Sequence, residues 1–244
     1  GIVPLGTTGE SSALTADEKR AVVDVCSAVC VARGAQLIVG AGTNSTATSV
    51  AAVQALAGTP GLSAVLIVVP YYVRPSEAGI VAHFRAVAGA SPVPVVLYNV
   101  PVRTVTDLMP DTVIALAEKY PDRIVGIKDA SGDLSRVADH RMGIARDFCQ
   151  LAGDDELWLP HSAAGGVGCI SVTANVAPKL CADFQAAIAA NDLTLARELN
   201  DRLYPIHYPI FYDASPSPCK YALSLVHDWL QEERRLPVRQ DTRL

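Results

Sequence analysis

The feature that most constrains the fold is a regular alternation between short apolar runs and longer stretches with helical periodicity. The runs predict seven strands, at residues 1–7, 35–42, 63–70, 93–100, 123–129, 147–154 and 166–172. Successive strands begin 19 to 34 residues apart, which leaves room for a helix in each gap. Repeated strand–helix units of this kind are typical of a parallel sheet covered by helices.

Two of the gaps carry clear helix boundaries. Thr15 and Glu18 have the spacing of a capping box, and the helical pattern that follows stops at Gly34. A second helical stretch has Pro110 near its first turn and ends at Pro121. Both boundaries support the predicted alternation.

Strands that are apolar on both faces suit either a doubly wound sheet or a (β/α)8 barrel. No strand leads into a G-x-G-x-x-G motif, which argues against a dinucleotide-binding sheet. Polar and glycine residues instead gather after each strand, in "GTTGE", "GAGTNS", "PYYVRP", "YNVPVRT", "KDASGD", "GDDE" and "SVTAN". Because a barrel builds its active site from these loops, their composition favours the barrel.

The number of predicted strands is one short of a barrel. Roughly seventy residues after the seventh strand have helix and loop patterns, so the missing unit is expected upstream. We therefore expect an α/β fold, a (β/α)8 TIM barrel lacking its first βα unit in this chain, with a C-terminal helical extension. Strands 2 to 8 would occupy residues 1–175, and the last barrel helix and the C-terminal helical region residues 176–244. An unusual open sheet is the alternative.

Composition excludes several classes of partner. The chain has 244 residues, of which 50% are hydrophobic, enough for one sizeable core. Its net charge is −5 and no Lys/Arg run exceeds two residues, so nucleic acid and anionic membranes are not expected partners. The longest apolar runs are too short to span a bilayer.

Cysteine and histidine patterns indicate no metal site. The six cysteines are scattered without a C-x-x-C spacing, and we interpret them as buried thiols in a reducing cytoplasm. The five histidines form neither H-x-H nor H-E-x-x-H. One acidic pair, Asp154 and Asp155, is interpreted as loop and capping chemistry. We therefore expect no metal.

The segment "RIVGIKDASGDL" places Lys128 at the end of an apolar strand. The chain has only five lysines, and lysine is almost never fully buried without a partner or a function. A desolvated amine is partly neutral and can attack a carbonyl to form a Schiff base. Gly126, on the same face, would leave room for a substrate. The alternative is an ion pair of Lys128 with Asp129 or another carboxylate.

Three other loops supply polar groups that suit this chemistry. Tyr98 could relay protons, and Arg103 could hold a substrate carboxylate with its bidentate fork. The hydroxyls and backbone N–H groups of "GTTGE" suit a carboxylate or a proton relay, although a turn followed by a helix cap explains them as well. The tyrosines of "PYYVRP" suit a subunit interface as well as catalysis.

Six motifs occur together and in order: "GTTGES", "PYY.RP", "YNVP.RT", "GIKDASGD", "GDD" and "GG.G.ISVTANV". With "DASPSPCKYAL" near the end, they make nearly the whole chain resemble the dihydrodipicolinate synthase family, which consists of pyruvate-dependent enzymes similar to class I aldolases.

The resemblance implies a catalytic set. Lys128 would form the Schiff base with pyruvate. Tyr98, Thr8 and Tyr72 would form a proton-relay triad, with Tyr72 acting in the site of a neighbouring subunit.

The resemblance also implies the residues that bind substrate. Thr7 and Thr8 would hold the carboxylate of pyruvate, and Arg103 that of L-aspartate 4-semialdehyde. The backbone carbonyls of Gly153 and Ile170 would line the pocket near the lysine.

The implied reaction condenses the two substrates to 4-hydroxy-tetrahydrodipicolinate, without metal or dissociable cofactor, in a cytoplasmic homotetramer built as a dimer of dimers. Two alternatives stay open. One is a lyase for a sugar-derived 2-oxo acid of the N-acetylneuraminate or keto-deoxy-gluconate type, against which Arg103 and the double Thr argue. The other is a non-catalytic barrel fragment.

The resemblance bears on feedback inhibition by lysine as well. Sensitive members bind lysine with histidines and an acidic residue at positions that match Ala16, Lys19 and Thr48. Because a cation at Lys19 repels the ligand's ammonium group and the acidic partner is absent, we expect weak or no lysine inhibition.

Overall fold

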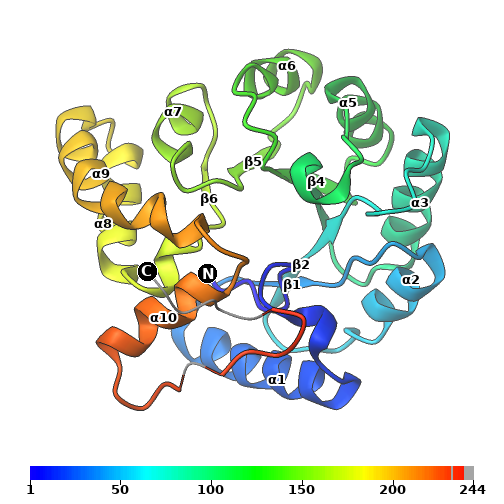
Figure 1. The fold of residues 1–244 in the computed structure, drawn as a ribbon. Helices are drawn as coiled ribbons and strands as arrows, with labels where there is room; N and C mark the ends of the chain where they lie inside the picture. The colour runs from blue at the N-terminus through cyan, green and yellow to red at the C-terminus, as the bar shows by residue number, and fades with distance from the viewer. Residues whose placement is uncertain (232, 239–244) are drawn as a thin grey trace.

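The computed structural model describes residues 1–231 and 233–238. Its centre is a six-stranded parallel sheet whose strands follow chain order, β1-β2-β3-β4-β5-β6. The strands are β1 (Leu37–Gly40), β2 (Leu62–Val68), β3 (Val95–Asn99), β4 (Ile124–Asp129), β5 (Cys149–Ala152) and β6 (Gly168–Cys169). The sheet curls, and the helices lie around its outer side (Figure 1). The predicted parallel α/β architecture is thus confirmed.

Helices connect and follow the strands. Between β1 and β6 the connections contain α2 (Thr46–Gln54), α3 (Glu77–Ala90), α4 (Pro101–Thr104), α5 (Pro110–Lys119), α6 (Ser135–Gly143) and α7 (Trp158–Ala163). Before β1 lie η1 (Ser11–Ala13) and α1 (Ala16–Arg33), and after β6 lie η2 (Thr173–Asn175), α8 (Pro178–Ala189), α9 (Leu193–His207), η3 (Pro209–Phe211) and α10 (Ser217–Val226). None of the helices in the described residues is both long and apolar enough to cross a membrane.

Two strand predictions need correction. Residues 1–7 form no regular strand, and only Ile2 bridges to Leu37, through Ile2 N–H to Gln36 O at 2.8 Å and Ile38 N–H to Ile2 O at 3.0 Å. Pro4 has no N–H, and Leu5 has a φ of 58°, so the extended backbone ends there. Strand β6 is two residues long instead of seven, since the glycine-rich approach "GGVG" favours irregular backbone.

The predicted helix boundaries are confirmed. The Thr15 hydroxyl accepts the Glu18 N–H at 3.3 Å, the Glu18 carboxylate accepts the Thr15 N–H at 2.8 Å, and α1 ends at Gly34 with a φ of 61°. Pro110 is the first residue of α5.

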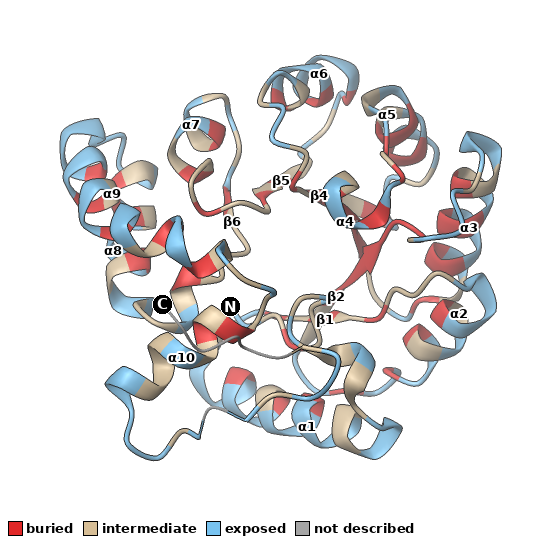
Figure 2. Ribbon diagram, in the orientation of Figure 1, coloured by how far each residue is buried: buried red, intermediate tan, exposed pale blue. Residues whose placement is uncertain are grey.

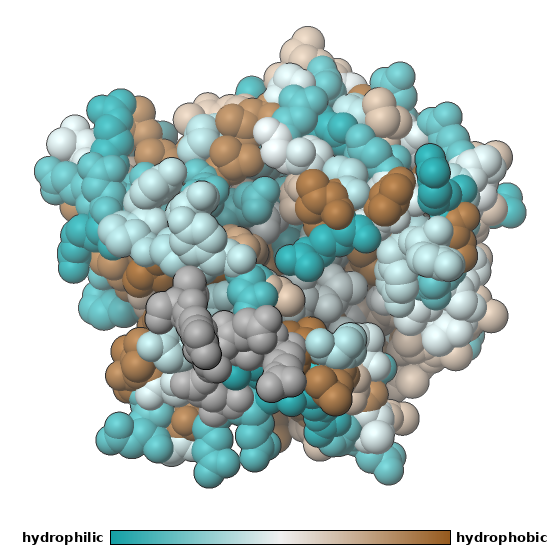
Figure 3. Space-filling model, viewed as in Figure 1, coloured by the Kyte–Doolittle hydropathy of each residue, from teal (hydrophilic) through white to brown (hydrophobic). Residues whose placement is uncertain are grey.

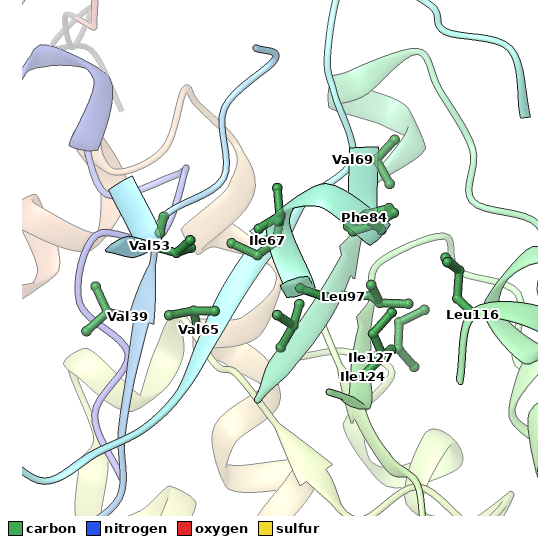
Figure 4. Packing of buried hydrophobic residues seen from close by; sticks show 14 of the residues in the cluster. Val39, Val53, Val65, Ile67, Val69, Phe84, Leu97, Leu116, Ile124 and Ile127 are labelled. Carbon is green, nitrogen blue, oxygen red and sulfur yellow. The ribbon is translucent and has the colours of Figure 1, made fainter. Parts of the chain in front are cut away.

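Apolar side chains alternate between the two faces of the sheet. The outward-facing side chains of the strands, such as Val65, Ile67 and Leu97, pack in one cluster with residues of the helices, such as Phe84 of α3 and Leu116 of α5 (Figure 4). The inward-facing members form a second cluster of Ala64, Leu66, Val68, Val96, Tyr98, Val100 and Ala130. Burial is concentrated along the strands and on the sheet-facing sides of the helices (Figure 2). Because successive side chains of a strand point to opposite faces, only every second strand residue can reach the inside of the curled sheet.

Polar and apolar groups are mixed on the face of the molecule that Figure 3 shows. Hydrophilic residues cover much of the face seen in Figure 3, with scattered apolar groups between them. All six cysteines are free, but only Cys30, Cys181 and Cys219 are buried, whereas Cys26, Cys149 and Cys169 are half-buried, so the prediction of buried thiols holds for half of them.

Candidate active site

Lys128 lies on the inner face of β4, one residue before the strand ends, and only 7% of its surface is exposed. Its partner across the β3–β4 ladder is Tyr98, which is 3% exposed. The Lys128 Nζ lies 4.2 Å from the centroid of the Tyr98 ring, within range of a cation–π interaction. The two residues at the centre of the predicted catalytic set are therefore in direct contact.

The ion-pair alternative for Lys128 does not hold within the described residues. Asp129 is on the opposite face of β4, where its Oδ1 accepts the Ser131 N–H at 2.7 Å. No carboxylate in the described ranges forms an ion pair with Lys128. An almost buried lysine without a carboxylate partner fits a chemical role better than a structural one.

The interpretation of Gly126 as room for a substrate is wrong. A Cβ built at Gly126 would lie 2.5 Å from the Cys149 carbonyl oxygen and 2.8 Å from the Cys149 Cβ. Gly126 is the ladder partner of Cys149. The glycine is therefore needed for the close approach of β4 and β5.

A cavity of about 550 Å³ opens at the carboxyl ends of the first strands. Thr7, Thr8 and Arg103 line it together, along with Tyr71 and the inner-face residue Val100. The Gly9 N–H donates to Gly6 O at 2.9 Å, so "GTTGE" is indeed a tight turn, and this turn presents both threonines to the cavity. Lys128 and Tyr98 are not part of the cavity lining, and Tyr98 adjoins it through the inner cluster that it shares with Val100.

The three positions that the resemblance links to lysine feedback line the same cavity. They are Ala16 and Lys19 of α1 and Thr48 of α2. A ligand at this end of the cavity would meet the ammonium group of Lys19 and no acidic side chain at Thr48.

Asp154, which the sequence suggested only as part of loop and capping chemistry, interacts electrostatically with Lys128. Burial and the charges of Asp155 and Glu156 raise the pKa of the Asp154 carboxyl, while Lys128 and Arg103 act in the opposite direction. Its carboxyl is thus within electrostatic reach of both cations. The pattern "GDDE" gave no signal to separate this residue from its neighbour.

Asp155 has the structural role that was expected of the acidic pair. It is fully buried, and it accepts hydrogen bonds from the Ser171 hydroxyl and, at 2.9 Å, from the Val172 N–H. Asp155 therefore fixes the loop after β6.

Gly153 and Ile170 follow β5 and β6 at the same end of the sheet. The Gly153 N–H donates to Asp129 O at 2.7 Å, and a Cβ there would lie 2.6 Å from the Cβ of Ala130. The Ile170 N–H donates to Ala152 O at 3.0 Å, and its side chain packs on the inner cluster that contains Tyr98. Both residues are thus next to the β4 terminus that carries Lys128.

Tyr72 lies away from the other predicted catalytic residues in the single chain. Its backbone has a φ of 71°, which is uncommon for a bulky residue, and 87% of its surface is exposed. It does not line the cavity, whereas Tyr71 does. The exposed Val73 follows it in the sequence, and the Tyr72 N–H donates at 3.3 Å to the carbonyl of Thr104 in α4, the helix that carries the exposed Val102.

The fold and the site define an α/β protein with a buried lysine that forms no ion pair within the described residues, beside a tyrosine at the carboxyl ends of parallel strands. A sequence profile described as the Dihydrodipicolinate synthetase family matches residues 1–243. The chain belongs to this family, and the resemblance inferred from its motifs is confirmed.

Individual relatives agree with this assignment. The chain is 60% identical over 237 residues to the 4-hydroxy-tetrahydrodipicolinate synthase of Erythrobacter litoralis, covering 97% of this chain and 80% of that protein. It is also 60% identical to the enzyme of the same name from Novosphingobium aromaticivorans, covering 97% and 79%.

Solved structures show the same similarity. The 4-hydroxy-tetrahydrodipicolinate synthase of Methylacidiphilum fumariolicum is 36% identical, with a TM-score of 0.93 over 98% of this chain and 78% of that one. The dihydrodipicolinate synthase of Aquifex aeolicus is 32% identical, with a TM-score of 0.92 over 98% and 80%.

Proposed function

We propose that this chain condenses pyruvate with L-aspartate 4-semialdehyde to 4-hydroxy-tetrahydrodipicolinate, a step of lysine and diaminopimelate biosynthesis in the cytoplasm. The observation that carries the proposal is the Lys128–Tyr98 pair. The lysine is 7% exposed, forms no ion pair with a carboxylate of residues 1–231 and 233–238, and has its amine 4.2 Å from the centroid of the tyrosine ring. The names of the relatives at 60% identity support the choice of substrates.

In the proposed mechanism, Lys128 is the nucleophile. Its neutral amine attacks the carbonyl carbon of pyruvate, and loss of water gives an iminium ion. Removal of a methyl proton gives an enamine, whose carbon attacks the aldehyde of the second substrate. The amino group of that substrate then attacks the iminium carbon, which closes the ring and releases the lysine amine.

Proton transfers in these steps are assigned to Tyr98, Thr8 and Tyr72. The carbinolamine must gain a proton on oxygen to lose water, and a phenol beside the amine is suited to this transfer. The exposure of Tyr72 in the single chain is compatible with action in the site of a second copy, as in the proposed homotetramer.

Substrate binding is assigned to the cavity-lining groups. Thr7 and Thr8 would bind the carboxylate of pyruvate through hydroxyl and backbone N–H groups, and Arg103 that of the semialdehyde. The carbonyls of Gly153 and Ile170 would complete the wall near Lys128. No metal or dissociable cofactor takes part in these steps.

For the architecture, we propose that residues 1–175 supply strands 2 to 8 of a (β/α)8 barrel and residues 176–244 its last helix and a C-terminal helical region. Six consecutive parallel strands and the bridge at Ile2 support this arrangement.

A turnover assay tests the function. The purified chain is incubated with pyruvate and L-aspartate 4-semialdehyde, and separately with N-acetylneuraminate or keto-deoxy-gluconate, and the products are identified by mass spectrometry. Condensation with the semialdehyde supports the proposal, release of pyruvate from a sugar acid favours the lyase, and no turnover favours a non-catalytic fragment.

A matched pair of variants makes this assay specific. Lys128→Met removes the proposed nucleophile, whereas Lys119→Met removes an amine that also faces a tyrosine ring, 5.9 Å from the centroid of Tyr120, but lies at the end of α5. Condensation should vanish in the first variant and persist in the second.

A further inference from the structure

The residues that follow Tyr98 and Lys128, the buried Asn99 and the half-buried Asp129, form a polar layer on the helix side of the sheet. Asn99 and Asp129 are ladder partners, and the strand alternation points their side chains away from the inner face. Their backbone carbonyls extend the ladder, since Asn99 O accepts the Ala130 N–H at 2.9 Å and Asp129 O accepts the Gly153 N–H at 2.7 Å. Anything that moves these two residues also moves Tyr98 and Lys128.

Asn99 is held at both ends of its amide group. It is fully buried, its Nδ2 donates to the Asp107 Oδ1 at 2.8 Å, and its Oδ1 accepts the Leu108 N–H at 3.0 Å. Asp107 and Leu108 belong to the loop between α4 and α5. The position of the β3 terminus therefore depends on the position of this loop.

Arg136 of α6 fixes that loop. Its guanidinium makes a bidentate pair with Asp107, at 2.8 Å from Nη1 to Oδ1 and 2.7 Å from Nη2 to Oδ2, and Nη1 also donates to Leu108 O at 3.3 Å. The side chain of Arg136 is 11% exposed and that of Asp107 34%. Arg136 holds the pKa of Asp107 below its ordinary value, so the pair is ionised at neutral pH.

Arg136 also faces the β4 side of the layer. Its Nε lies 3.6 Å from the Asp133 Oδ2, and the charges of Asp107, Asp129 and Asp133 all raise its pKa. Arg136 and Asp129 line the same small cavity between β4 and α6. The Arg136 guanidinium is thus linked to Asn99 at the end of β3 by hydrogen bonds through Asp107, and to Asp129 at the end of β4 by charge.

We propose that Arg136 is a positioning residue for the reaction, acting through Asp107 and Asn99 to hold Tyr98 in register with Lys128. This inference rests on the proposed function, because it assigns a purpose to the contact between the Lys128 amine and the Tyr98 ring. Arg136 touches neither of these side chains. Its contribution is the relative placement of two strand termini, to which proton transfer between their side chains is sensitive.

The test measures the rate at which borohydride traps the pyruvate adduct on Lys128, together with kcat and KM for pyruvate. Arg136→Gln is expected to lower the trapping rate and kcat about 10- to 100-fold, the cost of a displacement on the order of 1 Å, and to leave KM for pyruvate within about twofold. Arg136→Lys retains the charge but not the fork, so it should recover only part of the loss. Arg141→Gln, on the same helix, is the control, because Arg141 donates to Ala164 O and not to this layer.

A double variant separates positioning from simple destabilisation. Arg136→Gln combined with Asp107→Asn should lose no more kcat than Arg136→Gln alone, because the two residues act as one unit. If Arg136→Gln does not fold, Arg136→Lys and Asp107→Asn give the same comparison.

Two results would overturn the inference about Arg136, and only the second of them would also refute the proposed function. If the unsubstituted chain traps pyruvate on Lys128 and folded Arg136 variants trap it equally fast, Arg136 only anchors α6 and the proposed function stands. If the unsubstituted chain forms no adduct, both the proposed function and the role of Arg136 fail.

Discussion

Replacement of Gly126 by alanine tests why β4 can carry Lys128 at this place. The added Cβ would lie 2.5 Å from the Cys149 carbonyl oxygen, roughly 0.9 Å inside the 3.4 Å at which ordinary contact begins. The obstacle is backbone, which cannot rotate away as a side chain can, so β4 and β5 must separate by about that amount. The displacement occurs two residues before Lys128.

Two effects of Gly126→Ala are expected together. Overpacking between paired strands should lower the free energy of unfolding by about 1–3 kcal/mol. A displacement near 1 Å at the strand that carries the nucleophile should lower kcat by up to about 100-fold. Thermal denaturation by circular dichroism and the condensation assay measure the two quantities on one preparation.

Gly89→Ala is the control for this experiment. Gly89 lies in α3 with nothing within 4 Å of a built Cβ, so alanine there should stabilise the chain by about 0.4–1 kcal/mol and leave kcat unchanged. If Gly126→Ala instead kept the wild-type melting temperature and raised only KM for pyruvate, the close-approach explanation would be wrong and Gly126 would serve to admit substrate.

Three further outcomes are expected. Because Arg136 lowers the pKa of Asp107, the stabilisation by this ion pair is complete above about pH 4 and is lost as the pH falls through the lowered pKa. The variant Asp107→Asn has no carboxylate to protonate, so its acid denaturation curve should lack this loss. A curve identical to that of the unsubstituted chain would contradict the prediction. Millimolar lysine should inhibit the condensation weakly or not at all because of the cation at Lys19, so strong inhibition in the same assay would refute that reasoning. Arg103→Lys should raise KM for the semialdehyde at least tenfold more than KM for pyruvate, and equal changes would remove Arg103 from semialdehyde recognition.

Much of the fold could be predicted because it depends on local patterns. The apolar runs predicted that Lys128 ends one strand and that Tyr98 lies near the end of another. Capping at Thr15 and termination at Gly34 were equally local. The turn at Pro4 and Leu5 was not recognised, because "GIVPLGT" is dominated by the propensities of its apolar residues for strands.

The geometry behind the site could not be predicted in the same way. The pairing of Tyr98 with Lys128 depends on the β3–β4 register, which shifts by one residue at Val95 and Val96. The ion pair between Asp107 and Arg136 joins residues 29 positions apart, for which one sequence gives no pairing signal. The influence of the charges of Lys128 and Arg103 on Asp154 likewise arises only when β4, α4 and the loop after β5 come together in the fold.

The central claim is that Lys128 is the nucleophile, and borohydride reduction of the folded chain in the presence of pyruvate, followed by peptide mass spectrometry, tests it most directly. A reduced pyruvate adduct on Lys128, absent from the other four lysines and from Lys128→Met, is the predicted result. An adduct on a different lysine, or no adduct on a chain that circular dichroism shows to be folded, would contradict it.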